Sequence, residues 1–94
     1  MRILEIVHLR LAGESPRALR DLVRESIGGG PDAGDVRVYR HATLGTDLAV
    51  HLVRRDGGQT DRVSDTGTRL ASLLRGYGMV EHAVWVEEGY DGLP

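Results

Sequence analysis

The stretch from Thr46 to Arg54 constrains the fold of this 94-residue chain more than any other. It is the most continuous run of β-type residues, and turn-forming residues bound it, Leu44-Gly45 before and Asp56-Gly57-Gly58 after. Successive side chains of a strand alternate between its two faces. One face therefore holds Leu48, Val50 and Leu52, and the other holds Asp47, Ala49, His51 and Val53. One apolar face and one mixed face predict a strand in the middle of a sheet that has helices on the first face.

The rest of the chain predicts three more strands and two helices. Strands are expected over 1–11, 36–43 and 79–87, and the polar pattern of the second of these suits a sheet edge. The first helix should begin at Ser15-Pro16 and end near Ile27, before Gly28-Gly29-Gly30-Pro31. The second should be capped by Thr60 or Asp61, with an inward stripe of Val63, Gly67, Leu70, Leu73, Leu74 and Tyr77. Glycine is unfavourable inside a helix, so either this helix approaches the sheet closely at Gly67 or it begins later.

The resulting order, βαββαβ, predicts a single α+β domain over 1–94, with residues 88–94 as a C-terminal tail. With right-handed crossovers it forms a ferredoxin-like, four-stranded antiparallel sheet in the order 4-1-3-2, with both helices on one face. The first and third strands are then central, and both carry side chains of the buried type on their two faces. The helix-free face would hold Leu4, Ile6, His8, Tyr39, His41, Ala49, His51, Val53, Ala83 and Trp85. Such an apolar face needs a cover, and a second copy of the same sheet predicts a homodimer.

Composition excludes several classes of function. The absence of cysteine excludes disulfides, thiolate metal sites and thiol catalysis, and the absence of lysine excludes Schiff-base mechanisms. A net charge of −2 argues against nucleic acid or an anionic membrane as the partner. No apolar run is long enough to cross a bilayer, and Arg2 and Glu5 interrupt the first apolar stretch, so neither a membrane span nor a signal peptide is expected. We therefore expect a cytoplasmic protein.

The element order, the opening strand Ile3-Leu4-Glu5-Ile6-Val7-His8-Leu9-Arg10-Leu11 and the closing Ala83-Val84-Trp85 resemble the dimeric α/β-barrel superfamily. This superfamily includes the antibiotic-biosynthesis monooxygenase-like proteins. The resemblance covers nearly the whole chain at the level of pattern, and it implies two sheets that face each other around a cavity. Enzymes of the family hold small aromatic, polyketide or haem substrates there. The haem-degrading branch of this superfamily uses an asparagine, a histidine and a tryptophan in the cavity. This chain has no asparagine, which argues against haem degradation.

The histidines are the residues most suited to chemistry in such a cavity. His8 and His51 lie on neighbouring central strands and are the candidate catalytic pair, because imidazole is a general acid or base near neutral pH. The candidate substrate-binding residues are His41, Tyr39, Trp85 and Asp47. Asp47 is expected at a different end of the cavity from the histidine pair. The alternatives are that the histidines are ordinary interface residues and that Trp85 is an apolar filler at the interface.

No cofactor and no stoichiometric metal are expected. Three histidines on one face can ligate a transition metal, but ligands on separate strands have none of the local spacing that marks a zinc site. His82 has the opposite parity, among valines, and is expected to be a hydrogen-bonded core residue. Two functions remain open: a cofactor-independent enzyme of monooxygenase or isomerase type, acting on a small molecule in the barrel cavity, and a non-catalytic dimeric module for ligand binding or regulation. A filled barrel would favour the second.

Overall fold

The computed structural model describes residues 2–11, 17–27, 35–43, 45–55 and 62–87. These residues form the elements β1 (Arg2–Arg10), α1 (Arg17–Ile27), β2 (Asp35–Arg40), β3 (Asp47–Arg55), α2 (Asp65–Leu74) and β4 (Met79–Val86). This is the βαββαβ order that the sequence predicts. No helix within the described ranges is long and apolar enough to cross a membrane.

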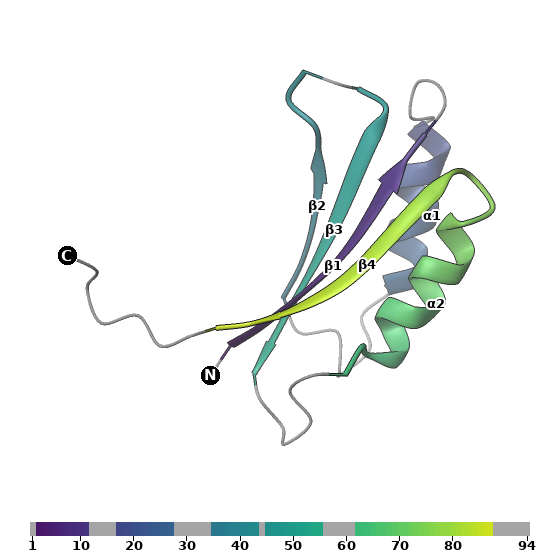
Figure 1. The fold of residues 1–94 in the computed structure, drawn as a ribbon. Coiled ribbons are helices and arrows are strands. Elements are labelled where there is room, and N and C mark those ends of the chain that lie inside the picture. The colour runs from purple at the N-terminus through teal and green to yellow at the C-terminus, as the bar shows by residue number, and fades with distance from the viewer. Residues whose placement is uncertain (1, 12–16, 28–34, 44, 56–61, 88–94) are drawn as a thin grey trace.

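The four strands form one antiparallel sheet in the order β2-β3-β1-β4, which reads 4-1-3-2 from the β4 edge. The central positions of β1 and β3 and the edge position of β2 are those expected from their side-chain patterns. Both helices lie on the same side of the sheet, and the other side has no helix over it among the residues described (Figure 1). The architecture is α+β and compatible with a ferredoxin-like arrangement.

The hydrophobic core fills the space between the helices and the sheet. The apolar face predicted for β3 is buried, since Leu48, Val50 and Leu52 are each at most 5% exposed. The other buried members of this core are Val7, Leu9, Leu19, Val23, Leu70, Ala71 and Leu74. Side chains from β1, β3 and both helices therefore exclude water together, which is the main stabilising term for a domain of this size.

Several predicted boundaries differ from the structure. α2 is capped by Ser64, whose side chain accepts a hydrogen bond from the Gly67 amide, so the predicted cap at Thr60 or Asp61 is wrong. Val63 and Tyr77 are each 47% exposed and lie outside the helix, whereas Ala71 is buried on its inward face. β2 ends at Arg40, three residues before the predicted end. The predicted start and end signals of the first helix (15–16 and 28–31) and the tail (88–94) lie outside the described residues.

The buried carboxylate of Glu5 connects three strands to the start of α2. Glu5 lies on the helix-facing side of β1 and is 0% exposed. Its oxygens accept hydrogen bonds from the backbone amide of Ser64 at 3.1 and 3.2 Å, and Oε1 lies 3.6 Å from Nη1 of Arg54 on β3. Oε2 also bonds Nε2 of His82 on β4, at 2.5 Å, which confirms His82 as a hydrogen-bonded core residue. A buried carboxylate is costly unless it is paired in this way.

Gly67 makes room for this carboxylate. A Cβ at Gly67 would lie 1.9 Å from Oε2 of Glu5 and 3.0 Å from Nε2 of His82. Both alternatives drawn from the sequence are therefore correct: α2 begins later than predicted, and its first turn lies directly against the sheet at Gly67. The position requires glycine because of this close approach.

Gly67→Ala should destabilise the fold. The added methyl group has to displace a fully buried carboxylate from its donors, and we expect the free energy of unfolding to fall by about 2–3 kcal/mol, the upper range for overpacking. Urea denaturation followed by circular dichroism measures the change.

Gly45→Ala is the matched control, because a Cβ at Gly45 meets nothing within 4 Å. Its free energy of unfolding should stay within about 0.5 kcal/mol of the wild-type value. Equal stability of the two variants would contradict the packing described for Gly67.

Candidate functional site on the open face of the sheet

The open face, defined as the side of the sheet away from α1 and α2, carries most of the residues that the sequence singles out. Strand register arranges its side chains in rows across the sheet. One row is Tyr39, Ala49, His8 and Glu81; the next is Arg37, His51, Ile6 and Ala83; the third is Asp35, Val53, Leu4 and Trp85. The two central strands thus carry His8 and His51 among apolar side chains, and the charged side chains of these rows lie on the edge strands.

His8 and Asp47 form a hydrogen-bonded pair across the two central strands. Nε2 of His8 lies 3.1 Å from Oδ2 of Asp47, and the two side chains are only 28% and 15% exposed. On the other side of the imidazole, Nδ1 lies 3.8 Å from a carboxylate oxygen of Glu81. When Nε2–H donates to Asp47, the lone pair of neutral His8 is on Nδ1, so this nitrogen can accept a proton.

Asp47 is held in its ionised form. Burial raises the pKa of this carboxyl group, but hydrogen bonds from His8 and Thr46 and the charges of His8 and Arg10 outweigh burial and lower it below 3.8. Thr46 donates its hydroxyl to Oδ1 at 3.1 Å, and Nε of Arg10 lies 4.0 Å from Oδ2. Asp47 is therefore an anion throughout the neutral pH range, fixed in place to orient His8.

A shallow hollow of about 230 Å³ lies beside this pair. Its lining is mostly apolar, with a few polar groups close to His8. The lining residues are Ile6, His8, Tyr39, Arg40, His41, Asp47, Leu48 and Ala49. An apolar hollow with few convergent polar groups is typical of a site for a small organic molecule.

His51 and Tyr39 form a second pair on the same face. Their ring centroids are 4.5 Å apart, with a tilt of 51° between the planes. Burial lowers the pKa of His51 below 6.5, so the imidazole is neutral at neutral pH. A neutral ring packed on tyrosine forms a wall that an aromatic ligand can contact.

Two more hollows lie toward the start of β1. One, of about 610 Å³, has His51 and several arginines in its wall; the other, of about 320 Å³, lies between Leu4, Val53 and Trp85. Trp85 is 61% exposed and lies opposite Leu4 in the register. Its ring is available either to a second copy of the chain or to a ligand.

The pairing of the predicted site residues differs from the expectation. In the register, His8 lies opposite Ala49 and His51 opposite Ile6, so the two histidines are diagonal neighbours with Cα atoms about 7–8 Å apart. The hydrogen-bonded partner of His8 is Asp47, which the sequence interpretation assigned to another end of the cavity. His41 follows β2 and is exposed, and its Nδ1 accepts a hydrogen bond from the Thr43 amide at 3.1 Å.

Metal-ligating side chains do not converge in the part of the chain that the structure describes. No group of three His, Asp or Glu side chains there could hold a metal ion. His8 and Asp47 supply only two ligand atoms at one place.

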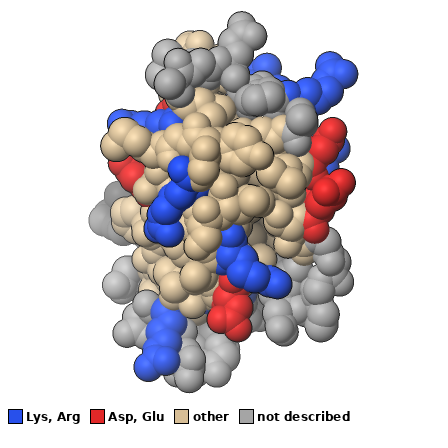
Figure 2. Space-filling view, turned by 90° about the vertical axis from the view of Figure 1, so that its right-hand side faces the viewer, with Lys and Arg blue, Asp and Glu red and all other residues tan. Residues whose placement is uncertain are grey.

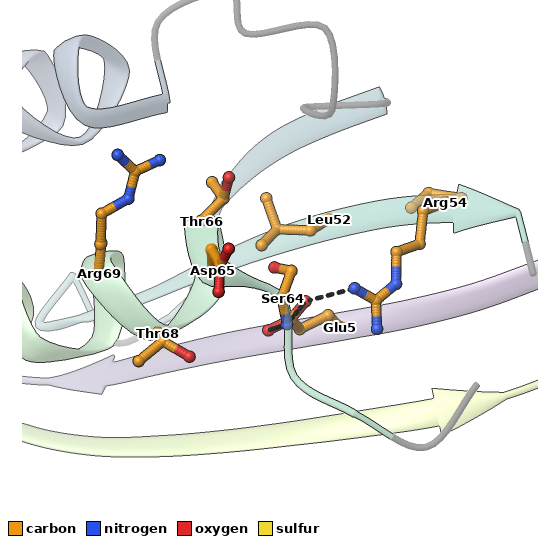
Figure 3. Close-up of a pocket in the computed structure, with 9 residues that line it drawn as sticks. Glu5, Leu52, Arg54, Ser64, Asp65, Thr66, Thr68 and Arg69 are labelled. Atoms are coloured by element: carbon orange, nitrogen blue, oxygen red, sulfur yellow. Dashed lines mark hydrogen bonds and ion pairs between the residues drawn. The ribbon is translucent and has the colours of Figure 1, made fainter. Parts of the chain in front are cut away.

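A polar pocket of about 750 Å³ lies on the other side of the sheet, at the start of α2. Figure 3 shows Ser64 and Arg54 beside Glu5 in its wall, with the ion pair to Arg54 marked. The sequence interpretation did not single out these residues. The available signal was a glutamate in the apolar row Ile3, Val7 and Leu9. Because the donors already described satisfy Glu5, we interpret the pocket as the outer surface of a structural cluster.

Comparison with known proteins finds no matching protein family, curated protein sequence or solved structure. The function of this chain has to be inferred from its own geometry.

The lowered pKa of His51 predicts a specific loss of stability in acid. The unfolded chain takes up a proton on His51 near its ordinary pKa of 6.5, while the folded chain does so only at lower pH. Stability is therefore full above about pH 6.5 and falls as the pH decreases below it. In His51→Gln, the drop in urea midpoint between about pH 7.5 and about pH 5.5 should be smaller than in the wild type.

Thr68→Gln, at an exposed and non-titrating position on α2, should keep the wild-type drop. An unchanged drop in His51→Gln would show that other groups cause the acid sensitivity.

Proposed function

We propose that this protein is a homodimer whose two open faces enclose a small-molecule cavity, and that His8 and Asp47 transfer a proton of an aromatic substrate there without a cofactor. The observation that carries the proposal is the hydrogen bond of 3.1 Å between His8 and Asp47 at the wall of an apolar hollow. The resemblance to dimeric α/β-barrel proteins supports the same arrangement.

The two sides of the molecule differ in a way that favours the open face for dimerisation. Figure 2 shows the helix-covered side, where cationic and anionic side chains are interspersed over α1 and α2. The open face instead has a band of apolar side chains that runs across β3, β1 and β4. They are Leu4, Ile6, Ala49, Val53, Ala83 and Trp85. A stable interface usually buries about 600–1,000 Å² on each partner, with an apolar centre and a polar rim.

A second copy would also change the environment of the His8–Asp47 pair. The hollow beside this pair is shallow in one copy, and a facing sheet would close it and exclude water. Exclusion of water strengthens the interaction between Asp47 and the positive charge that His8 acquires on taking a proton. The proposed site is therefore complete only in the dimer.

The proposed chemistry is a proton shuttle. Nδ1 of His8 takes a proton from a carbon next to a carbonyl group, and the electrons of the broken C–H bond form an enolate. His8 then returns a proton to the enolate, either the same proton at another atom or, after exchange with solvent, a solvent-derived one at the same carbon. Atoms and charge balance without an oxidant or reductant. Asp47 orients His8 and stabilises its charge, as the carboxylate does in other histidine–carboxylate pairs.

Ala49→Asp should dissociate the dimer, because it places an unpaired charge in the middle of the open face. Light scattering at micromolar concentration should give a dimer for the wild type and a monomer for this variant. Trp85 is the only tryptophan of the chain and is 61% exposed in one copy. Its emission should shift to longer wavelength when the dimer dissociates.

Thr68→Asp, at an exposed position on the helix-covered side, should remain dimeric. A wild-type chain that is monomeric under these conditions would contradict the proposed interface.

Hydrogen–deuterium exchange at the acidic methylene of β-tetralone, a flat bicyclic ketone, tests the proposed chemistry. We expect the wild type to accelerate exchange in D₂O, followed by proton NMR. His8→Gln should reduce this acceleration about 100-fold, the usual effect of losing a general base. Asp47→Asn should reduce it about 10-fold or more, because His8 loses its orienting carboxylate.

Thr68→Gln, at an exposed position on the helix-covered side, is the control and should stay within about threefold of the wild type, well below the effect of losing a general base. Binding of β-tetralone without acceleration would favour the non-catalytic binding module. Acceleration that survives in both His8→Gln and Asp47→Asn would place the chemistry elsewhere.

A further inference from the structure

One end of the open face is cationic. The hollow of about 610 Å³ beside His51 has three arginines and one aspartate in its wall. Its lining residues are Arg2, Asp35, Arg37, Tyr39, His51, Val53 and Arg54. An excess of guanidinium groups in the wall of a hollow attracts anions, and each guanidinium can bind a carboxylate through two parallel hydrogen bonds.

The three arginines are not equally available. Arg54 is engaged by the buried Glu5 and donates a hydrogen bond to the backbone carbonyl of Arg62. Nε of Arg37 lies 3.4 Å from Oδ2 of Asp35. Both side chains are more than half exposed, so this ion pair is weak and exchangeable. The guanidinium of Arg2 has no hydrogen bond or ion pair with the residues that the structure describes. Arg2 and Arg37 therefore have donors to offer an incoming anion.

Tyr39 joins this cationic hollow to the apolar hollow beside His8. Its side chain lines both hollows, and its ring packs on His51, which lies opposite Arg37 in the register. A ligand that crosses from one hollow to the other would thus lie against the Tyr39 and His51 rings. Aromatic faces favour a flat ligand at this point.

We infer that the ligand of the open face is a flat aromatic carboxylate whose acid group binds Arg37 and Arg2 while its ring reaches across Tyr39 toward His8. This inference rests on the proposed function of the open face and adds the class of ligand to it.

The register sets the size of such a ligand. Arg37 and His8 are two strands apart laterally and one same-face step apart along the strands, so their Cα atoms are about 12 Å apart. Because side chains of strands stand roughly perpendicular to the sheet, a ligand of one or two fused rings, about 8 Å between its acid group and its far end, fits between the two positions.

Isothermal titration calorimetry with two probes of the same ring system tests the inference on the 94-residue chain. The probes are 6-hydroxy-2-naphthoate, which carries a carboxylate and a hydroxyl group at opposite ends, and β-naphthol, which lacks the carboxylate. We expect the carboxylate to bind at least about tenfold more tightly, the effect of one charge-assisted hydrogen-bond pair. Arg37→Gln should remove most of this preference and leave the affinity for β-naphthol unchanged.

Asp35→Asn provides a matched variant with the opposite expected sign. Removal of the competing carboxylate frees Arg37, so binding of 6-hydroxy-2-naphthoate should become tighter in this variant. If the two substitutions acted only by disturbing the structure, they would not change the affinity for 6-hydroxy-2-naphthoate in opposite directions.

The outcomes separate the inference from the proposal beneath it. Equal affinity for the two probes in the wild type, or a preference that Arg37→Gln retains, would overturn the carboxylate inference while the open face remains a binding site. Failure of both probes to bind would overturn the small-molecule function of the open face itself, and the inference with it.

Discussion

The buried carboxylate of Glu5 is the interaction on which the rest of the structure depends. It lies at 0% exposure on β1 and is held by Arg54 of β3, His82 of β4 and the amide of Ser64 at the start of α2. Loss of any one of these partners would leave a charge in the core with incomplete compensation, which is far more costly than the loss of an exposed ion pair. Three strands and the start of one helix therefore all meet at this carboxylate. Apolar packing alone would tolerate small shifts between them, because it has little directional preference.

The coarse fold could be predicted because its determinants are local and periodic. Alternation in β1 and β3 placed both strands in the centre of the sheet, and the polar β2 belonged at an edge. The cap of α2 was predicted at Thr60 or Asp61, but Ser64, three residues farther along, has the same capping chemistry and is the observed cap. What selects Ser64 is a tertiary contact: its amide bonds Glu5, 59 residues away in the chain. A glycine inside a helix is unusual, so Gly67 indicated a close approach at this point. It did not indicate which group occupies the space beside it.

The candidate site was predicted only as a set of residues on one face. Parity placed His8, Asp47, His51 and Tyr39 on the same face, with Asp47 expected at another end of the cavity, but their pairing depends on the register between strands. The register is set by hydrogen bonds and long-range contacts between the strands, and side-chain alternation does not specify these. Ala49 therefore faces His8, and Asp47, one same-face step before Ala49 on β3, reaches His8 from the side. His51, one same-face step after Ala49, is a diagonal neighbour of His8 as well, but it packs on Tyr39.

Glu5 and His8 lie on opposite faces of the same strand, and this connects the core to the proposed chemistry. Glu5 is paired through its side chain with both neighbouring strands, so β1 cannot slip by one residue without moving the carboxylate to the open face and His8 under the helices. The same constraint that satisfies the buried charge therefore sets the position of His8 relative to Asp47 on β3. Their geometry is preorganised from beneath, by a polar cluster that takes no part in the proposed proton transfer.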